Sequence, residues 1–278
     1  VGSGDVYKRQ VLKEQKRDKK FLLIVIAASC LVAAMFGSRN SLSLTIEGID
    51  QSQTLNYLQI SFAFALGQLV VGAISPFAGM IADKYGSGKT LTVGILLGLL
   101  GIILIPYSTT AFTLSISLGV ISSIGLGVAG LPVVLASVNR LIPQNKVGMA
   151  FGLVNAGQSL GQLILAPLAG FIIVNFGWIL CILFLCTVLL LVLPFSFILR
   201  SRTDTKQPSS VQTKSLSETL RIAFNTPSYI YLVVGFFVCG FHVAFIATHM
   251  PGVIQVCGMP PTVSGWSLGL IGFFNIVG

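Results

Sequence analysis

Two short stretches of the sequence carry the spacing of nucleotide-binding loops. Residues 82–90 read ADKYGSGKT and end in Gly88-Lys89-Thr90, the residue types that close a phosphate-binding P-loop. Residues 125–130 read GLGVAG and match the G-x-G-x-x-G spacing of a dinucleotide-binding turn. Either motif can bind a nucleotide only where a β-strand leads into a helix, so the surrounding elements decide what each motif means.

Neither stretch is predicted to bind a nucleotide. A P-loop has a glycine five residues before Gly88, and this chain has Asp83 there, whose carboxylate would repel phosphate. The second stretch lies inside a long apolar segment, where small residues let helix backbones approach closely. We therefore interpret Gly125, Gly127 and Gly130 as a helix-packing face.

One arginine and two histidines fall within apolar segments, where polar and charged groups are costly and are therefore functional candidates. The guanidinium of Arg39 could bind an anion in a central cavity, or it could extend to a membrane interface and pair with Glu47 or Asp50. His242 and His249 are seven residues apart and so share one helix face. They could relay protons, or they could only hydrogen-bond a neighbouring helix.

A polar stripe provides the remaining candidates. Asn155, Gln158 and Gln162 recur at i, i+3 and i+7 within another apolar segment. They could line a polar path, or they could link helices by hydrogen bonds worth about 0.6–2 kcal/mol each. An internal comparison also aligns FGSR, which ends at Arg39, with CGFH, which ends at His242. These five residues are the predicted substrate-binding set.

The elements that carry these residues are predicted to be membrane helices. The chain is 54% apolar and 9% charged, with a mean hydropathy of +0.91, whereas soluble domains are about 25% charged. A bilayer core of roughly 30 Å needs about 20 apolar residues per helix. The fold class is therefore an all-α membrane protein. An eighth span begins near residue 264, and the seven complete spans are predicted at about 21–46, 55–81, 90–107, 112–138, 148–174, 178–199 and 229–250.

The net charge of +9 reflects membrane topology. When the loops are counted alternately from the N-terminus, one set holds the lysines and arginines and the other holds only Glu47 and Asp50. By the positive-inside rule, the N-terminus is cytoplasmic. We therefore expect a multi-pass protein of a cell membrane, the inner membrane in a bacterium, and no binding to nucleic acid.

The cysteines and the acidic residues argue against a metal site, a cofactor and a carrier of cations. The five cysteines form no C-x-x-C pair and are interpreted as apolar packing residues, so neither a metal site nor a cofactor is predicted. No Asp or Glu lies within the predicted spans. An anion carrier needs a fixed positive charge and few competing carboxylates, whereas an exporter of cations usually has an acid in the membrane. Catalysis is not expected.

Residues 79–89, GMIADKYGSGK, resemble a loop signature of the major facilitator superfamily, G-x-x-x-D-[RK]-x-G-x-[RK]-[RK]. Gly88 departs from it, because a basic residue is usual there. The resemblance implies that this loop braces one conformational state of a transporter. From the residue types, Gly79 would allow a close helix contact, and Asp83 would cap or pair with a neighbouring helix N-terminus. The matching residues are Gly79, Asp83, Lys84, Gly86 and Lys89.

The resemblance extends over nearly the whole chain from about residue 21, and it implies two six-helix units joined by a linker. Seven complete spans and part of an eighth are present, so we expect an N-terminal fragment. Residues 1–10, VGSGDVYKRQ, resemble adaptor sequence, so we expect that they are not native. The predicted organisation is a cytoplasmic tail at 1–20, a six-helix unit at 21–199, a cytoplasmic linker at 200–228 and the start of a second unit at 229–278.

Two stretches resemble the monocarboxylate and oxalate–formate branch, FGSRNSLSL at 36–44 and GFFVCGFHVAFIATHMPGVI at 235–254. That resemblance implies a secondary transporter of small organic anions, coupled to protons or to exchange. Arg39 would neutralise the carboxylate and His242 would line the cavity. The implied partners are the substrate, protons and the lipid bilayer, for a monomeric protein. Two alternatives are a drug or metabolite efflux transporter and a seven-span receptor or sensor.

Overall fold

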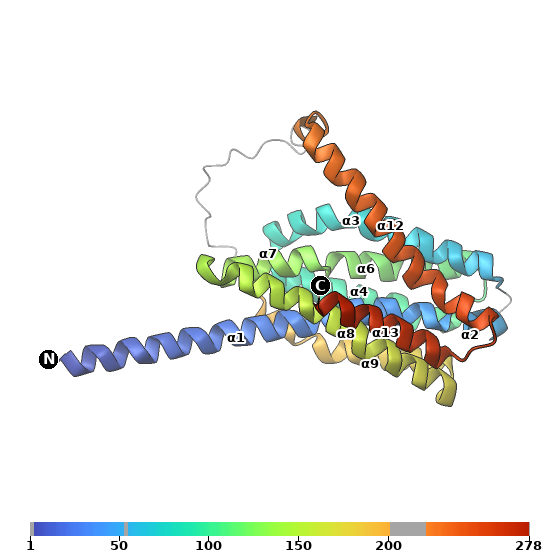
Figure 1. The fold of residues 1–278 in the computed structure, drawn as a ribbon, viewed down its shortest axis with the longest axis horizontal. Helices are drawn as coiled ribbons and strands as arrows, with labels where there is room; N and C mark the ends of the chain where they lie inside the picture. The colour runs from blue at the N-terminus through green and yellow to red at the C-terminus, as the bar shows by residue number, and fades with distance from the viewer. Residues whose placement is uncertain (1–2, 53–54, 201–220, 278) are drawn as a thin grey trace.

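The structure, a computed structural model, describes residues 3–52, 55–200 and 221–277, and these residues form a bundle of helices (Figure 1). The first half of the chain forms α1 (Ser3–Leu42), η1 (Ser43–Thr45), α2 (Ile46–Ser52), α3 (Tyr57–Tyr85), α4 (Ser87–Ile103) and η2 (Ile105–Tyr107). The rest comprises α5 (Ala111–Leu114), η3 (Ser115–Ser122), α6 (Ser123–Val128), α7 (Leu131–Leu141), η4 (Gln144–Lys146), α8 (Val147–Phe176), α9 (Trp178–Val192), α10 (Phe195–Ile198), α12 (Pro227–Val256) and α13 (Pro261–Val277).

The predicted membrane spans are confirmed. Among the described residues, seven helical segments are long and apolar enough to cross a membrane, and α13 is a shorter apolar helix. The predicted linker at 200–228 lies mostly outside the described residues. The seven segments are Arg17–Asp50, Tyr57–Tyr85, Ser87–Tyr107, Ala111–Leu141, Gln144–Phe176, Trp178–Ile198 and Pro227–Val256.

The bundle has two ends, which are called the tail end and the α2 end. The tail end holds the turn between α3 and α4 and the η4 turn before α8, and the α2 end holds α2 and the turn between α8 and α9. At the tail end, Gly86 terminates α3 and begins α4 with φ 91°, a conformation that favours glycine. At the α2 end, Asn56 caps α3, because its Oδ1 accepts from the Gln59 N–H at 3.0 Å.

The fourth span, predicted at 112–138, is confirmed as Ala111–Leu141, but it consists of several helical segments. A short α-helical turn leads into the π-helical segment η3, then α6 follows, and the chain breaks at Gly130 before α7. Pro132, in the first turn of α7, lacks the N–H that an interior helical residue donates, so it fits a helix start. Hydropathy predicts the span but does not distinguish α-helical from π-helical turns, so it gives no sign of this division.

Glycines of the fourth span pack against its neighbours, as predicted for two of the three. A Cβ atom at Gly125 would collide with the backbone of Gly98 in α4, and one at Gly127 would collide with Ile74 in α3. These contacts confirm the packing interpretation for Gly125 and Gly127. Gly130 instead precedes α7 at the helix break.

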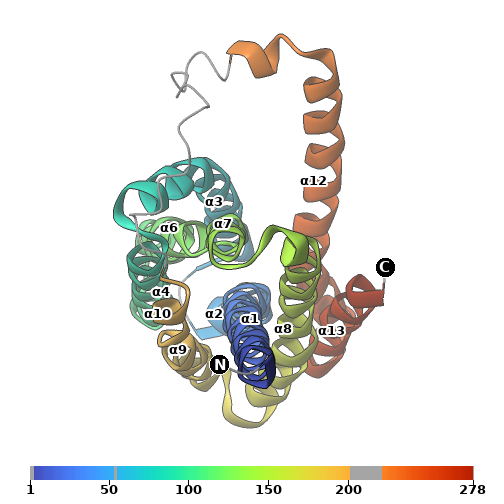
Figure 2. The same cartoon turned by 90° about the vertical axis from the view of Figure 1, so that its left-hand side faces the viewer.

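The helix α8 lies between α1 and α13 (Figure 2). On one side, a Cβ at Gly161 would collide with the backbone of Ala33 in α1. On the other side, a Cβ at Gly265 of α13 would lie 2.7 Å from the carbonyl oxygen of Ala166. Small residues on both faces therefore fix α8 as the element that joins the first six spans to α13.

The seventh span, α12, contacts the other helices mainly near the α2 end. Side chains at 229–243 are exposed, whereas Pro251 and Gly252 are buried. The helix meets η1, α2 and α3 near its C-terminus and diverges from α3 toward the tail end (Figure 1, Figure 2). The helices α3 and α12 therefore meet at the α2 end and lie apart at the tail end.

Candidate functional site

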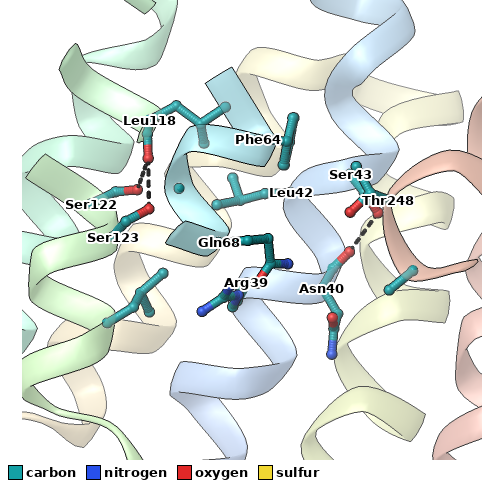
Figure 3. Close-up of a pocket in the computed structure, with 13 residues that line it drawn as sticks. Arg39, Asn40, Leu42, Ser43, Phe64, Gln68, Leu118, Ser122, Ser123 and Thr248 are labelled. Atoms are coloured by element: carbon teal, nitrogen blue, oxygen red, sulfur yellow. Dashed lines mark hydrogen bonds between the residues drawn. The ribbon is translucent and has the colours of Figure 1, made fainter. Parts of the chain in front are cut away.

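Arg39 lies in the last turn of α1, and its side chain points toward α3 (Figure 3). The guanidinium donates a hydrogen bond to the Oε1 atom of Gln68, which lies on α3. Arg39 is half-buried, and no carboxylate pairs with it in the part of the chain that the structure describes. The partner of this cation is thus a neutral amide.

A polar cavity of about 40 Å³ adjoins Arg39 on the side nearer the α2 end (Figure 3). Asn40 and Ser43 line it from α1 and η1, and Thr248 lines it from α12. On the opposite wall, the hydroxyls of Ser122 and Ser123 both donate to the carbonyl oxygen of Leu118, at 2.7 and 3.1 Å. The junction of η3 and α6 therefore brings two hydroxyl groups to the wall opposite Asn40 and Ser43.

A second cavity, of about 200 Å³, adjoins Arg39 on the side nearer the tail end. Val32 and Phe36 line it from the preceding turns of α1, and Ser75 lines it from α3. Gln158 lines it from α8. Arg39 lines both cavities and therefore separates a polar compartment from a more apolar one.

A third cavity, of about 360 Å³, lies between α3 and α12. It shares Phe64, Gln68 and Thr248 with the polar cavity, so the two adjoin along that wall. Its other lining is mostly apolar and aromatic, and it comprises Ser61, Ala65, Leu69, Phe241, Ala244, Phe245 and His249.

Tyr57 and His249 join α3 to α12 at the α2 end. The Tyr57 hydroxyl lies 3.4 Å from Nδ1 of His249, and the two rings are 6.5 Å apart between centroids. A Cβ at Gly252 would lie 2.5 Å from the same hydroxyl, so the glycine allows the tyrosine to sit against α12. His249 also lines the third cavity, so this contact lies beside its wall.

One of the other predicted residues lies with Arg39, and three do not. Gln158 lines the second cavity with it. Asn155 is exposed and donates to the carbonyl oxygen of Phe151 in its own helix, at 3.0 Å. Gln162 is buried, and its Cβ faces Gly272 of α13. His242 is exposed, and its Nδ1 lies 2.9 Å from the carbonyl oxygen of Val238, also in its own helix.

The predicted set did not include Gln68 and Thr248, although both lie at the Arg39 site. Each is a polar residue in an apolar span, which is the signal that could have found them. Several other polar residues carry the same signal, and spacing along one chain does not show which helices are neighbours.

The predicted loop motif lies at the tail end, away from the three cavities. Asp83 forms an ion pair with Arg140 in the last turn of α7, so the expected pairing with a helix N-terminus was wrong. A helix C-terminus favours cations, and Arg140 brings the positive charge that pairs with the carboxylate. The close helix contact expected at Gly79 is not found among the described residues, where a Cβ would meet nothing within 4 Å.

The departure at Gly88 has a packing explanation. A Cβ there would lie 2.9 Å from the Cβ of Arg200 and 3.1 Å from the carbonyl oxygen of Ser196. The hydroxyl of the preceding Ser87 donates to the carbonyl oxygen of Leu199 at 2.8 Å. The start of α4 is therefore pressed against the end of the sixth span, and a longer basic side chain would not fit at residue 88.

Comparison with known proteins identifies similar sequences. The sequence model of the Major Facilitator Superfamily matches residues 23–278. Riboflavin transporter RibZ of Clostridioides difficile is 28% identical over 162 residues, which are 58% of this chain and 35% of that protein. Monocarboxylate transporter 11 of Mus musculus is 25% identical over 178 residues, or 64% of this chain and 39% of that protein. Monocarboxylate transporter 2 of Homo sapiens is 26% identical over 156 residues, which are 56% of this chain and 32% of that protein. The matches thus span about a third of each relative's length.

Solved structures share the fold at lower identity. A bacterial homologue of the human lysosomal transporter Spinster, in an inward-facing and unoccupied conformation, gives a TM-score of 0.71 at 15% identity, covering 93% of this chain and 60% of that one. A D-xylose–proton symporter gives a TM-score of 0.61 at 18% identity, covering 92% of this chain and 66% of that one. These similarities establish the fold of the bundle.

Proposed function

The chain belongs to the Major Facilitator Superfamily, and we propose that it is a secondary active transporter of small organic anions resembling monocarboxylates. Members of the family are transporters, and the chain is part of an integral multi-pass membrane protein. The observation that carries the proposal is Arg39, a cation between two cavities whose hydrogen-bond partner is the neutral amide of Gln68.

The chemistry of Arg39 favours an anion. A guanidinium has five N–H donors in a planar fork, and it matches the two oxygens of a carboxylate. One amide oxygen neither neutralises the charge nor uses all the donors. A charge within a membrane is costly unless it is paired, and a bound carboxylate would supply the missing negative charge.

The surroundings of Arg39 support the same choice. Among the residues that the structure describes, no aspartate or glutamate lines the three cavities around Arg39. A cationic substrate would meet a fixed positive charge and no acid there, whereas an anion would meet Arg39 and several hydroxyl groups. The names of the monocarboxylate transporter relatives agree with this choice.

Alternating access provides the mechanism of transport. In the proposed organisation, residues 21–199 form one unit, 200–228 a cytoplasmic linker and 229–278 the start of the second unit. With a cytoplasmic N-terminus, the described arrangement is inward-open, because α3 and α12 meet at the α2 end and diverge at the tail end. The Asp83 loop, with Gly79, Lys84, Gly86 and Lys89, would bias the equilibrium between states at the cytoplasmic face.

Coupling is proposed to be to protons or to exchange with another anion. His249 lines the third cavity, so it is better placed than His242 to sense a proton near the substrate. A drug or metabolite efflux transporter of the same superfamily and a non-transporting receptor remain the competing functions. Acidic residues in the cavities would favour the first, and binding without flux would favour the second.

The test is uptake of labelled acetate into sealed proteoliposomes that contain the full-length protein, with and without an acidic exterior. The proposal expects accumulation above that of protein-free vesicles, driven by the pH gradient or by preloaded anion. Arg39→Gln should abolish this uptake, whereas Lys19→Gln, a change of an exposed cation of α1 that lines none of the three cavities, should leave it intact. Carboxylate binding with no net flux under either gradient would instead support a receptor.

A further inference from the structure

The cavities near Arg39 differ greatly in size and chemistry. The polar cavity that holds the guanidinium is about 40 Å³, whereas the adjoining cavity between α3 and α12 is about 360 Å³. Ligand sites are commonly 300–1,000 Å³, with apolar and aromatic walls and a few placed polar groups. The larger cavity has this character, and Gln68, the hydrogen-bond partner of Arg39, is part of its wall.

Gln68 marks the place where the two cavities join. It lines both, and its Oε1 accepts from Arg39. That amide oxygen occupies the position that a carboxylate oxygen would take on the guanidinium. A carboxylate that displaced it would lie at the wall formed by Phe64, Gln68 and Thr248, so the rest of the molecule would extend into the larger cavity.

Exposed aromatic rings line the cavity on the α12 side. Phe241 and Phe245 lie one helical turn apart, and their rings stack with centroids 6.2 Å apart and planes at 16°. Both rings line the cavity, so they are placed to contact a ligand inside it. The ring of His249 continues the row, 5.1 Å from that of Phe245. Such a row favours a flat ring, because aromatic pairs gain about 0.5–1.5 kcal/mol beyond the burial of their area.

The geometry points to aromatic monocarboxylates of the size of benzoate or phenylacetate as the preferred substrates. The carboxylate binds Arg39, and the ring lies against Phe241 and Phe245 between α3 and α12. A two- or three-carbon acid binds the same guanidinium but leaves the aromatic faces in water. This inference rests on the proposed transport of organic anions and specifies the substrate of the same site.

The open end of the cavity agrees with the direction of entry. Tyr57 and His249 join α3 to α12 at the α2 end, whereas α12 diverges from α3 toward the tail end. An aromatic acid therefore enters from the tail end and meets Phe241 first, then Phe245 and Arg39. Its ring does not need to pass the Tyr57–His249 contact until the two units change conformation.

The test compares binding and uptake of benzoate and acetate by the full-length protein in proteoliposomes. Benzoate should bind at least about tenfold more tightly than acetate, and Phe245→Ala should weaken benzoate binding about tenfold while acetate binding changes less than about twofold. Phe236→Ala is the matched control, because Phe236 lies on the same helix, is 70% exposed and does not line the cavity.

A second variant fills the cavity and keeps its apolar character. Ala244→Phe should exclude benzoate and retain acetate, since Ala244 lines this cavity and neither of the two cavities that Arg39 lines. Equal binding of benzoate and acetate, or an equal loss of binding of both acids in Phe245→Ala, would overturn the inference. In that case, uptake of acetate would still support the proposed transport function. Absence of uptake for both acids by folded protein would overturn the transport function and this inference together.

Discussion

The contact between α1 and α8 gives a quantitative prediction, because one glycine on α8 touches backbone and another touches nothing. A Cβ at Gly161 would collide with the oxygen, carbonyl carbon and Cα of Ala33. A Cβ at Gly152, also within α8, would meet nothing within 4 Å. Gly161→Ala and Gly152→Ala therefore make the same change of sequence in one helix with different steric consequences.

The magnitudes follow from two opposing effects. Alanine is favoured over glycine within a helix by about 0.8–1.0 kcal/mol, and this gain applies to both variants. Overpacking costs about 1–3 kcal/mol, and at Gly161 the colliding atoms are backbone, so the upper part of that range applies. We expect Gly161→Ala to lose about 1–2 kcal/mol net, while Gly152→Ala is neutral or gains up to about 1 kcal/mol.

The assay is thermal unfolding of the detergent-solubilised protein. Cys181 and Cys186 are buried, so their reaction with a thiol-reactive fluorophore reports unfolding once the half-buried Cys30 and the exposed Cys239 and Cys257 are replaced by serine. At about 2–4 °C per kcal/mol, the apparent Tm of Gly161→Ala should lie several degrees below that of Gly152→Ala. Equal Tm values for the two variants would refute the close backbone contact. Because Gln158 lies one turn before Gly161, the same variant should also alter uptake.

Two other contacts give further predictions. Asp83→Asn should destabilise the protein by only about 0.2–1 kcal/mol, because the side chains of Asp83 and Arg140 are 62% and 28% exposed. The charge swap Asp83→Arg with Arg140→Asp should recover that loss in thermal unfolding, and a swap no more stable than the single variant would contradict the pair. Gly252→Val should separate α12 from α3 at the α2 end, where its Cβ meets the Tyr57 hydroxyl. The distance between spin labels at residues 56 and 257 should lengthen in this variant. It should not lengthen in the control Gly240→Val, because a Cβ at Gly240 meets nothing within 4 Å. An unchanged distance in both variants would contradict the contact between Gly252 and Tyr57.

The helical fold could be predicted from the sequence because bilayer thickness fixes the length of apolar segments. The interior of the fourth span could not be predicted, since the π-helical turns at 115–122 and the break at Gly130 have the same apolar composition as an α-helix. Gly125 and Gly127 were interpretable as packing residues because nucleotide binding needs a strand that a membrane span does not supply.

The candidate site could be predicted only in part. Arg39 stood out because an arginine within a span is rare, and Gln158 followed from the polar stripe on α8. Gln68 and Thr248 needed knowledge of which helices are neighbours. The partner of Asp83 also needed the structure, because several basic residues lie near the tail end and any of them could supply the positive charge.

The proposed transport mechanism depends on a division of roles within the described bundle. The ion pair of Asp83 with Arg140 joins α3 to α7, both within the first unit, so rigid-body movement between units leaves it intact. The contact of Tyr57 with His249 instead joins α3 to α12 and must break when the α2 end opens. The Asp83 loop is therefore expected to act from within one unit at the tail end, whereas the Tyr57–His249 contact connects the two proposed units at the α2 end.

The measurement that tests the central claim most directly is the affinity of the purified full-length protein for carboxylates. Isothermal titration calorimetry measures it, with acetate and benzoate as the probes. A hydrogen bond to a charged group contributes about 1.5–3 kcal/mol, so Arg39→Gln should weaken binding of both acids at least about tenfold. Lys19→Gln, which changes an exposed cation outside the cavities, should leave binding unchanged. If folded Arg39→Gln binds both acids as tightly as the native protein, Arg39 is not the anion site and the proposed function loses its basis.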